Sequence, residues 1–159
     1  MYVRSTLQSA VWRYSADDLK YELLWVHIDN MFIGALYHPP KPNYDQKSLL
    51  CYIEASLDEL TQKYPTASVV LAGDFNQLPD NCVVERSGLT QIVRQPTRGS
   101  SILDRIYVSD PMGFHTVRVV RSIVKSMDKA VIAYPQQQQG VRVNVSTRVT
   151  YRKVTPNRK

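Results

Sequence analysis

Short segments rich in Val, Ile, Trp and Tyr dominate the first forty residues of the chain. Apolar and polar positions alternate in part, as in strands with one buried face, over residues 8–14, 21–28 and 31–37. Asp29 and Asn30 separate the last two segments and suit a two-residue hairpin turn, although the glycine common in such turns is absent. Regular strand pairing ends at Pro39, Pro40 and Pro42. The pattern therefore predicts three strands, the last two joined in a hairpin.

The next segment has the apolar spacing of a helix. Over residues 45–63 one apolar stripe is formed by Leu49, Leu50, Ile53, Leu57 and Leu60. Asn43 and Gln46 stand three residues apart, as in a capping box, and Tyr64-Pro65 closes the segment. We therefore expect a helix that packs its apolar stripe on a sheet.

The second half of the chain predicts a strand, a long loop and three further strands. Residues 69–72 are wholly apolar, which suits a strand buried on both faces. We expect residues 77–100 to form a loop with a short ordered piece at 89–93. Further strands are predicted over residues 102–108, 115–120 and 129–134. The mixed order of strands and helix predicts an α/β domain over residues 1–135. Residues 136–159 begin with four glutamines and carry no acid, so they are expected to be a basic linker or disordered tail.

The charge of the chain is unevenly distributed. Residues 1–85 carry six basic and eleven acidic side chains, a net of −5, whereas residues 86–135 carry eight basic and three acidic, a net of +5. The last 24 residues add six basic side chains, which gives the total of +6. Two interpretations stay open: a basic second half that follows the phosphates of a nucleic acid, or a solvated tail that binds nothing specific.

Composition excludes several classes of protein. Cys51 and Cys82 have no further cysteine or histidine at ligand spacing, so we expect two reduced thiols and no zinc site. No apolar run approaches the roughly 20 residues that cross a bilayer, and the first residues lack the apolar core of a secretory signal. These features predict an intracellular protein, nuclear or cytoplasmic, that is neither secreted nor inserted in a membrane.

Two acidic side chains are the strongest candidates for chemistry. Asp74 and Asn76 follow the apolar segment 69–72, and a carboxylate at the end of such a strand projects into the crevice where α/β proteins bind ligands. The alternative is a turn in which both side chains bond their own backbone. Asp104 interrupts an apolar strand and needs a partner there, such as a histidine, a metal ion or an arginine in a salt bridge. Tyr37 ends a strand and is either a hydrogen-bond donor at a site or half-buried packing.

Several of these segments occur in a characteristic order. They are Tyr37-His38-Pro39-Pro40, the predicted helix, Gly73-Asp74-Phe75-Asn76, Pro96-Thr97-Arg98 and Leu103-Asp104-Arg105-Ile106-Tyr107-Val108-Ser109. In this order they resemble the endonuclease/exonuclease/phosphatase (DNase I-like) superfamily, and within it the apurinic-type endonuclease domain of non-LTR (LINE-like) retrotransposons. The resemblance covers residues 1 to about 134. Residues 151–157 look like the linker that such elements place before their reverse transcriptase.

This resemblance implies a four-layer α/β sandwich that hydrolyses DNA phosphodiesters with Mg²⁺ as cofactor. Asp74 would orient or deprotonate the attacking water, Asn76 would hold the phosphate and Tyr37 would stabilise charge on the phosphoryl oxygens. Asp104 would orient the histidine that contacts the phosphate, and two arginines would bind phosphate, Arg98 and Arg105. The expected partner is DNA, with no small-molecule cofactor.

The sequence departs from the family pattern at two places. The family has a metal-binding Glu and an Asn on earlier strands, and we expect the chain to begin after that region and to correspond to the carboxy-terminal portion of the domain. The family's Ser-Asp-His is replaced by Ser126-Met127-Asp128, so Met127 and Asp128 are degenerate positions, and thioether sulfur is a poor ligand for Mg²⁺.

These departures predict an incomplete or inactive endonuclease. The alternatives are a non-catalytic remnant that at most binds nucleic acid and, less favoured, a phosphatase of small molecules on the same fold. Loss of the first strands would bare an apolar sheet face, with residues 21–37 as the most exposed part, and would promote self-association.

Overall fold

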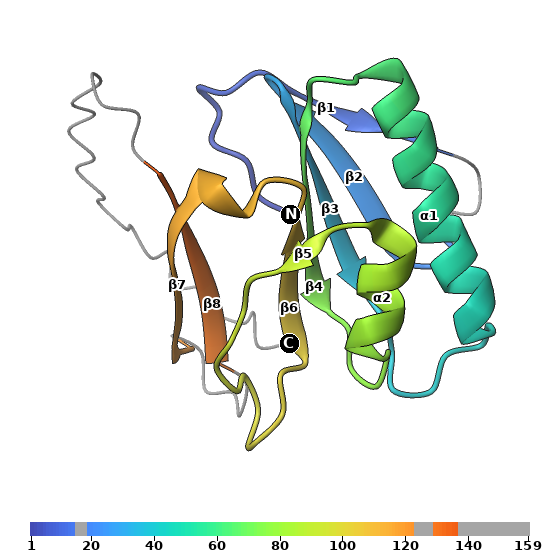
Figure 1. Ribbon diagram of the computed structural model, residues 1–159, viewed down its shortest axis with the longest axis vertical. Coiled ribbons are helices and arrows are strands. Elements are labelled where there is room, and N and C mark those ends of the chain that lie inside the picture. The colour runs from blue at the N-terminus through green and yellow to red at the C-terminus, as the bar shows by residue number, and fades with distance from the viewer. Residues whose placement is uncertain (15–18, 123–128, 137–159) are drawn as a thin grey trace, which may run out of the picture.

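A six-stranded sheet forms the centre of the computed structural model, which describes residues 1–14, 19–122 and 129–136. Its strand order is β1-β2-β3-β4-β6-β5, with bounds β1 Ser9–Trp12, β2 Leu23–Ile28, β3 Met31–Tyr37, β4 Ser68–Asp74, β5 Thr90–Gln91 and β6 Asp104–Val108. The helices are α1 (Gln46–Lys63) and α2 (Asp80–Ser87), and a 3-10 turn, Pro111–Gly113, precedes a two-stranded sheet of β7 (Phe114–Arg121) and β8 (Lys129–Pro135) (Figure 1). The predicted mixed α/β class is confirmed.

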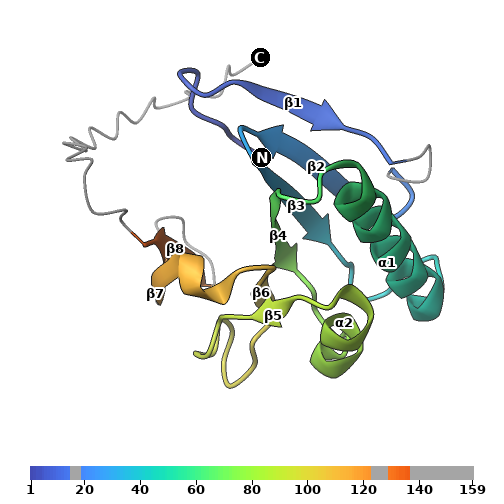
Figure 2. The same cartoon turned by 45° about the horizontal axis from the view of Figure 1, so that its top comes forward.

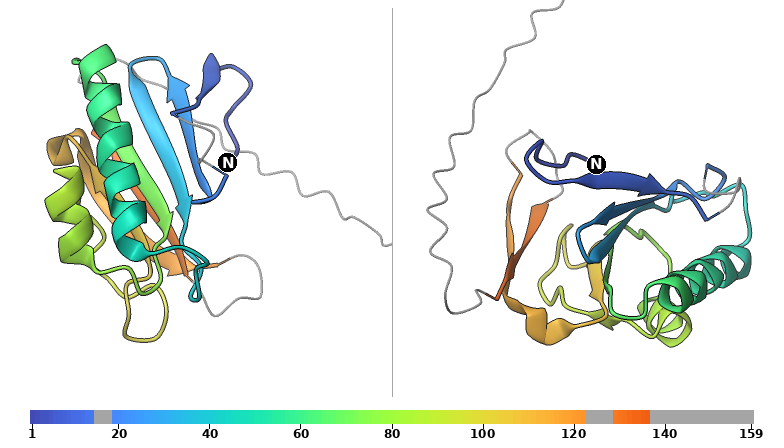
Figure 3. Two further views of the ribbon diagram at one scale, coloured as in Figure 1. Left: turned by 90° about the vertical axis from the view of Figure 1, so that its right-hand side faces the viewer. Right: turned by 90° about the horizontal axis from the view of Figure 1, so that it is seen from above.

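The helices cover one face of the six-stranded sheet. α1 and α2 lie on one side of it and the β7–β8 pair lies on the other (Figure 3). Because α1 joins β3 to β4, these two central strands run parallel, whereas the other neighbours in the sheet are antiparallel. The apolar stripe of α1 is buried as expected, with Leu49 and Ile53 fully covered against the sheet side chains Phe32 and Leu71.

The start of α1 differs from the sequence prediction. Asp45 is the N-cap, and its carboxylate accepts a hydrogen bond from the Ser48 amide at 3.0 Å. Asn43 lies two residues before that cap, so the predicted capping box of Asn43 and Gln46 is wrong. An aspartate three residues before an available N–H takes the same role.

The predicted loop of residues 77–100 contains a helix. α2 spans Asp80–Ser87 and ends at Gly88, whose φ of 66° closes the helix in the left-handed region. Only Val83 of this short helix is fully buried, so the sequence carries too little apolar periodicity to reveal it. The ordered piece expected at 89–93 is found as Thr90–Gln91 of β5, with Leu89 and Val93 buried beside it.

The sheet face turned away from α1 and α2, here called the open face, is only partly covered. Val69 and Leu71 of β4 are buried under the helices, whereas Val70 and Ala72 point to the open face and are half-buried. The prediction that this strand is buried on both faces is therefore wrong. A cavity of about 270 Å³ separates the open face near Val70 from Phe114 of the β7–β8 pair, and Figure 2 shows the pair standing beside the sheet.

The open face stays apolar toward its other edge. Ile33 and Ala35 are half-buried there, and 38% of Leu24 is exposed. In the described part of the chain no helix is long and apolar enough to cross a membrane.

Candidate functional site

Three of the predicted site residues lie side by side at one end of the sheet. Tyr37, the last residue of β3, pairs with Asp74, the last residue of β4, and Asp74 pairs with Asp104, the first residue of β6. Directly paired residues of neighbouring strands point to the same face, about 5 Å apart. Alternation along the strands places all three on the open face, and we call them the strand-end row. Tyr37 is 45% exposed, and both carboxylates are half-buried.

Asp74 and Asn76 form a tight turn after β4. The Asn76 amide N–H donates to Asp74 Oδ1 at 3.0 Å, and Asn76 takes a positive φ of 42°. Asn76 Nδ2 donates to the carbonyl of His38 at 2.8 Å, and the side chain is buried. The turn that was the alternative interpretation of this motif is therefore present. An amide nitrogen carries two hydrogens, so the bond to His38 leaves the second N–H for another acceptor.

A buried histidine lies beneath the strand-end row, and the sequence did not single it out as a site residue. His38 is 1% exposed, its Nδ1 is 3.0 Å from the Tyr44 hydroxyl, and its backbone N–H donates to the Asp74 carbonyl at 2.8 Å. Burial lowers the pKa of His38, and the negative charge of Asp74 offsets part of that effect. Burial, with smaller contributions from Glu22 and Tyr21, raises the pKa of Tyr44 to about 12. At neutral pH the site therefore rests on an uncharged imidazole and a protonated phenol.

Asp104 is fixed by a threonine from a different segment. The Thr97 hydroxyl oxygen accepts hydrogen bonds from the amides of Leu103 at 3.0 Å and Asp104 at 3.1 Å, and Thr97 is fully buried. The Leu103 carbonyl in turn accepts from the Phe75 amide at 2.9 Å. The start of β6 is thus tied both to Thr97 and to the turn that follows Asp74.

The structure does not bring Arg105 to the strand-end row. Its side chain lies on the helix-covered face, 9% exposed, and donates to backbone carbonyls at 2.6 Å from Leu78, 2.9 Å from Ile102 and 3.4 Å from Asn76. A guanidinium occupied in this way holds the loop after β4 and faces away from Asp74, which differs from the expected contact with phosphate.

Arg98 is half-buried in a turn next to Thr97, where its amide donates to the Ser101 carbonyl at 3.1 Å. This arginine therefore lies in the segment that fixes Asp104. Met127 and Asp128 lie outside the described residues.

Two carboxylates of the strand-end row are the candidate ligands for a cation. Within residues 1–14, 19–122 and 129–136, no three His, Cys, Asp or Glu side chains gather closely enough to hold a metal ion. Mg²⁺ is commonly held by one or two carboxylates, with substrate phosphates and water completing its shell. Asp74 and Asp104 fit that donor set.

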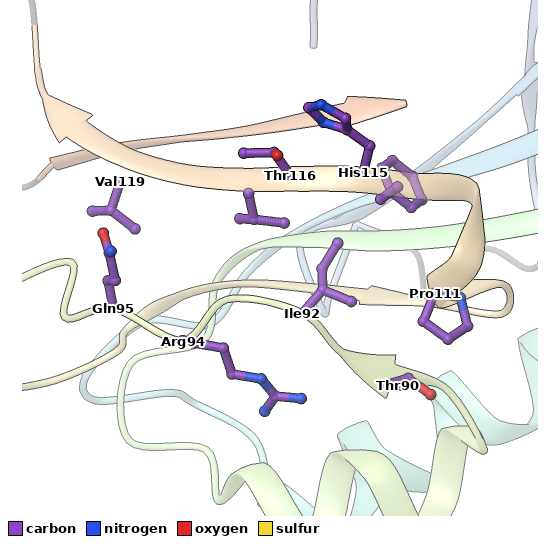
Figure 4. A pocket seen from close by; sticks show the side chains of 10 residues that line it. Thr90, Ile92, Arg94, Gln95, Pro111, His115, Thr116 and Val119 are labelled. Carbon is purple, nitrogen blue, oxygen red and sulfur yellow. The ribbon is translucent and has the colours of Figure 1, made fainter. Parts of the chain in front are cut away.

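A separate groove lies against β7. Its volume is about 350 Å³, and it lies between β7 and the segment that follows β5 (Figure 4). Ile92, Val117 and Val119 line it together with the more polar Arg94 and Thr116. None of its lining residues belongs to the strand-end row, so it is not part of the candidate site.

Comparison with known proteins identifies the fold. Neither a protein-family model nor a curated protein matches the chain. Among solved structures, the endonuclease domain of TRAS1, a telomere-specific non-LTR retrotransposon, superposes with a TM-score of 0.62 at 15% identity, over 86% of this chain and 72% of that chain. The chain shares the DNase I-like fold in part. CdtB, the biologically active subunit of cytolethal distending toxin, matches with a TM-score of 0.49 at 16% identity, over 72% of this chain and 51% of that one.

The DNase I-like fold confirms the resemblance that the order of sequence motifs predicted. At this level of identity the match concerns the arrangement of the backbone alone. The roles of Tyr37, Asp74, Asn76 and Asp104 stay predictions, supported by their place at one end of the sheet.

Proposed function

We propose that this chain supplies the strand-end part of a Mg²⁺-dependent site for DNA phosphodiesters, and that by itself it binds DNA without cutting it. The observation that carries the proposal is the register of three strands, which sets Tyr37, Asp74 and Asp104 in one row on the open face. The DNase I-like fold supports DNA as the substrate. In its complete form this fold would be a four-layer sandwich in which a second sheet, to which β7 and β8 belong, covers the open face.

Each residue of the strand-end row has a chemical role in this proposal. Asp74 and Asp104 would hold Mg²⁺, and the bound ion would act as a Lewis acid on a phosphoryl oxygen. Asp74 also accepts a hydrogen bond from water and so orients it toward the phosphorus. The Tyr37 hydroxyl, at the exposed end of β3, donates to a phosphoryl oxygen. Positioned donors and a cation are what phosphoryl transfer chiefly requires.

Binding without cleavage is favoured by the rest of the site. The family's Asp-His pair is replaced by Met127-Asp128, and the described residues provide two clustered carboxylates but no third ligand. Loss of one electrostatic group of this kind typically lowers the rate about 10²–10³-fold. Asp74 and Asp104 could still bind a cation together with a phosphate. Binding can therefore persist where hydrolysis is lost.

The test combines cleavage and binding in one set of proteins. We expect no nicking of supercoiled plasmid in Mg²⁺ or Mn²⁺. Binding to a short duplex should strengthen when Mg²⁺ is added, and Asp74→Asn should abolish that gain. Asp58→Asn, an exposed position on α1 at the opposite face, is the matched control and should behave as wild type.

Two results would contradict the proposal. Metal-dependent nicking that disappears in Asp74→Asn would show a complete catalytic site. Duplex binding that responds neither to Mg²⁺ nor to Asp74→Asn would show that the strand-end row is not a phosphodiester site.

A further inference from the structure

A buried threonine joins the strand-end row to the first residue of β8. The Thr97 hydroxyl oxygen accepts from the Asp104 amide at 3.1 Å, and the Thr97 carbonyl accepts from the Lys129 amide at 3.0 Å. The preceding carbonyl, that of Pro96, accepts from the Lys129 ammonium at 3.2 Å. We call these contacts the Thr97 clip. They hold an exposed ammonium at the same end of the sheet as the two carboxylates.

Lys129 is placed to supply positive charge to this site, whereas Arg105 is not. A DNA phosphate brought to two carboxylates requires positive charge beside it, even with one bound cation. The Arg105 guanidinium is turned to the helix-covered face and occupied by backbone carbonyls. Lys129 is exposed, and a carbonyl is a weaker partner for its ammonium than a charged phosphate oxygen.

We infer that Lys129 contacts the DNA phosphate next to the strand-end row and that Thr97 is the positioning residue that places it there. This inference rests on the proposed function, because it assigns two further residues to the same site. Thr97 acts through both of its oxygens, since one fixes Asp104 and the other fixes the backbone of Lys129. A change at Thr97 therefore disturbs the phosphate contact without removing any charge.

The salt dependence of DNA binding tests this inference. A lysine that contacts one phosphate contributes about one to the slope of log affinity against log salt concentration. We expect Lys129→Gln to lower that slope by about one and Lys129→Arg to keep it. Lys47→Gln, which removes an exposed charge from the first turn of α1, is the matched control and should leave the slope unchanged.

Thr97 is tested by two substitutions of different chemistry. Thr97→Val keeps the shape but removes the oxygen that accepts from Leu103 and Asp104. Because this loosens the segment whose backbone carbonyls hold Lys129, it should lower the slope in the same direction as Lys129→Gln. Thr97→Ser retains the oxygen and should restore the slope of the wild type. Circular dichroism and urea unfolding report whether each variant is folded. If Thr97→Val does not fold, Thr97→Ser and the pair of Lys129 variants decide the question.

The outcomes separate this inference from the proposed function. A slope unchanged in Lys129→Gln would overturn the phosphate contact, and an unchanged slope in folded Thr97→Val would overturn the positioning role. In both cases the loss of Mg²⁺-dependent binding in Asp74→Asn would still stand. If instead Asp74→Asn binds as wild type does, the proposed function fails, whatever the Lys129 variants show.

Discussion

Neighbouring side chains at the strand ends divide between the two faces of the sheet. Tyr37 and Asp74 point to the open face, whereas His38 continues the alternation of β3 and is buried on the helix side against Tyr44. A buried imidazole therefore lies directly behind the side chains of the strand-end row. Burial of that ring makes the stability of the fold depend on its protonation.

We predict that the free energy of unfolding decreases as the pH falls below about 6.5, which is the ordinary pKa of a histidine in an unfolded chain. Since burial lowers the pKa of folded His38, the unfolded chain binds a proton first, so acid favours unfolding until the folded pKa is passed. His38→Asn should remove this part of the pH dependence, and His115→Asn, exposed on β7, should not. Urea unfolding between pH 7.5 and pH 4.5 is the measurement. Equal pH dependence in wild type and His38→Asn would show that His38 does not cause it.

The positions of several candidate site residues could be predicted because residue type and local position suffice. Asp74 was expected at the end of a strand and Asp104 in the next apolar strand, and the structure places them as direct neighbours. Thr97 and His38 could not be assigned contacts in this way. Their partners lie in other segments, so their roles depend on strand register, which short-range patterns do not specify. Side chains alternate between the two faces along β6, so Arg105 lies on the face opposite to Asp104. The sequence alone did not show which of the two faces is covered by the helices.

At the scale of elements, the success of the prediction follows the length and periodicity of each segment. β3 was predicted with the bounds Met31–Tyr37, and α1 began one residue later than expected, because both carry a sustained apolar pattern. α2 was missed, since eight residues with one fully buried side chain give no stripe. β5 has only two residues and is defined by its pairing with β6, so its own composition does not reveal it.

The strand order also lies beyond local patterns. β4 pairs with β3 on one side and with β6 on the other, and this arrangement creates the strand-end row. The helix between β3 and β4 implied that they run parallel. No local sequence pattern specified that β6 would pair with β4.

At the scale of the whole molecule, the open face and the separate β7–β8 pair bear on how the chain associates in solution. On that face Ile33, Ala35 and Val70 are only half-buried and Leu24 is 38% exposed, whereas Val26 is buried. An apolar face of this kind favours association. We propose that the chain self-associates through it.

This proposal predicts a measurable response to one added charge. Leu24→Glu should reduce binding of a dye that reports exposed apolar surface and should shift size-exclusion elution toward the monomer. Val84→Glu is the matched control, because Val84 is 37% exposed on α2, on the opposite side of the sheet. Sharp monomer elution of the wild type without dye binding, or an equal effect of both substitutions, would count against the open face as the contact surface.

The proposed cation site is tested most directly by a titration of the isotope-labelled chain with Mn²⁺, followed by NMR. Mn²⁺ takes the same oxygen ligands as Mg²⁺ and broadens the signals of nearby amides. We predict that the amides of Tyr37, Asp74 and Asp104 broaden first and that Asp74→Asn removes the effect. Broadening centred on other residues, or none at millimolar Mn²⁺, would contradict the claim that the strand-end row binds a divalent cation.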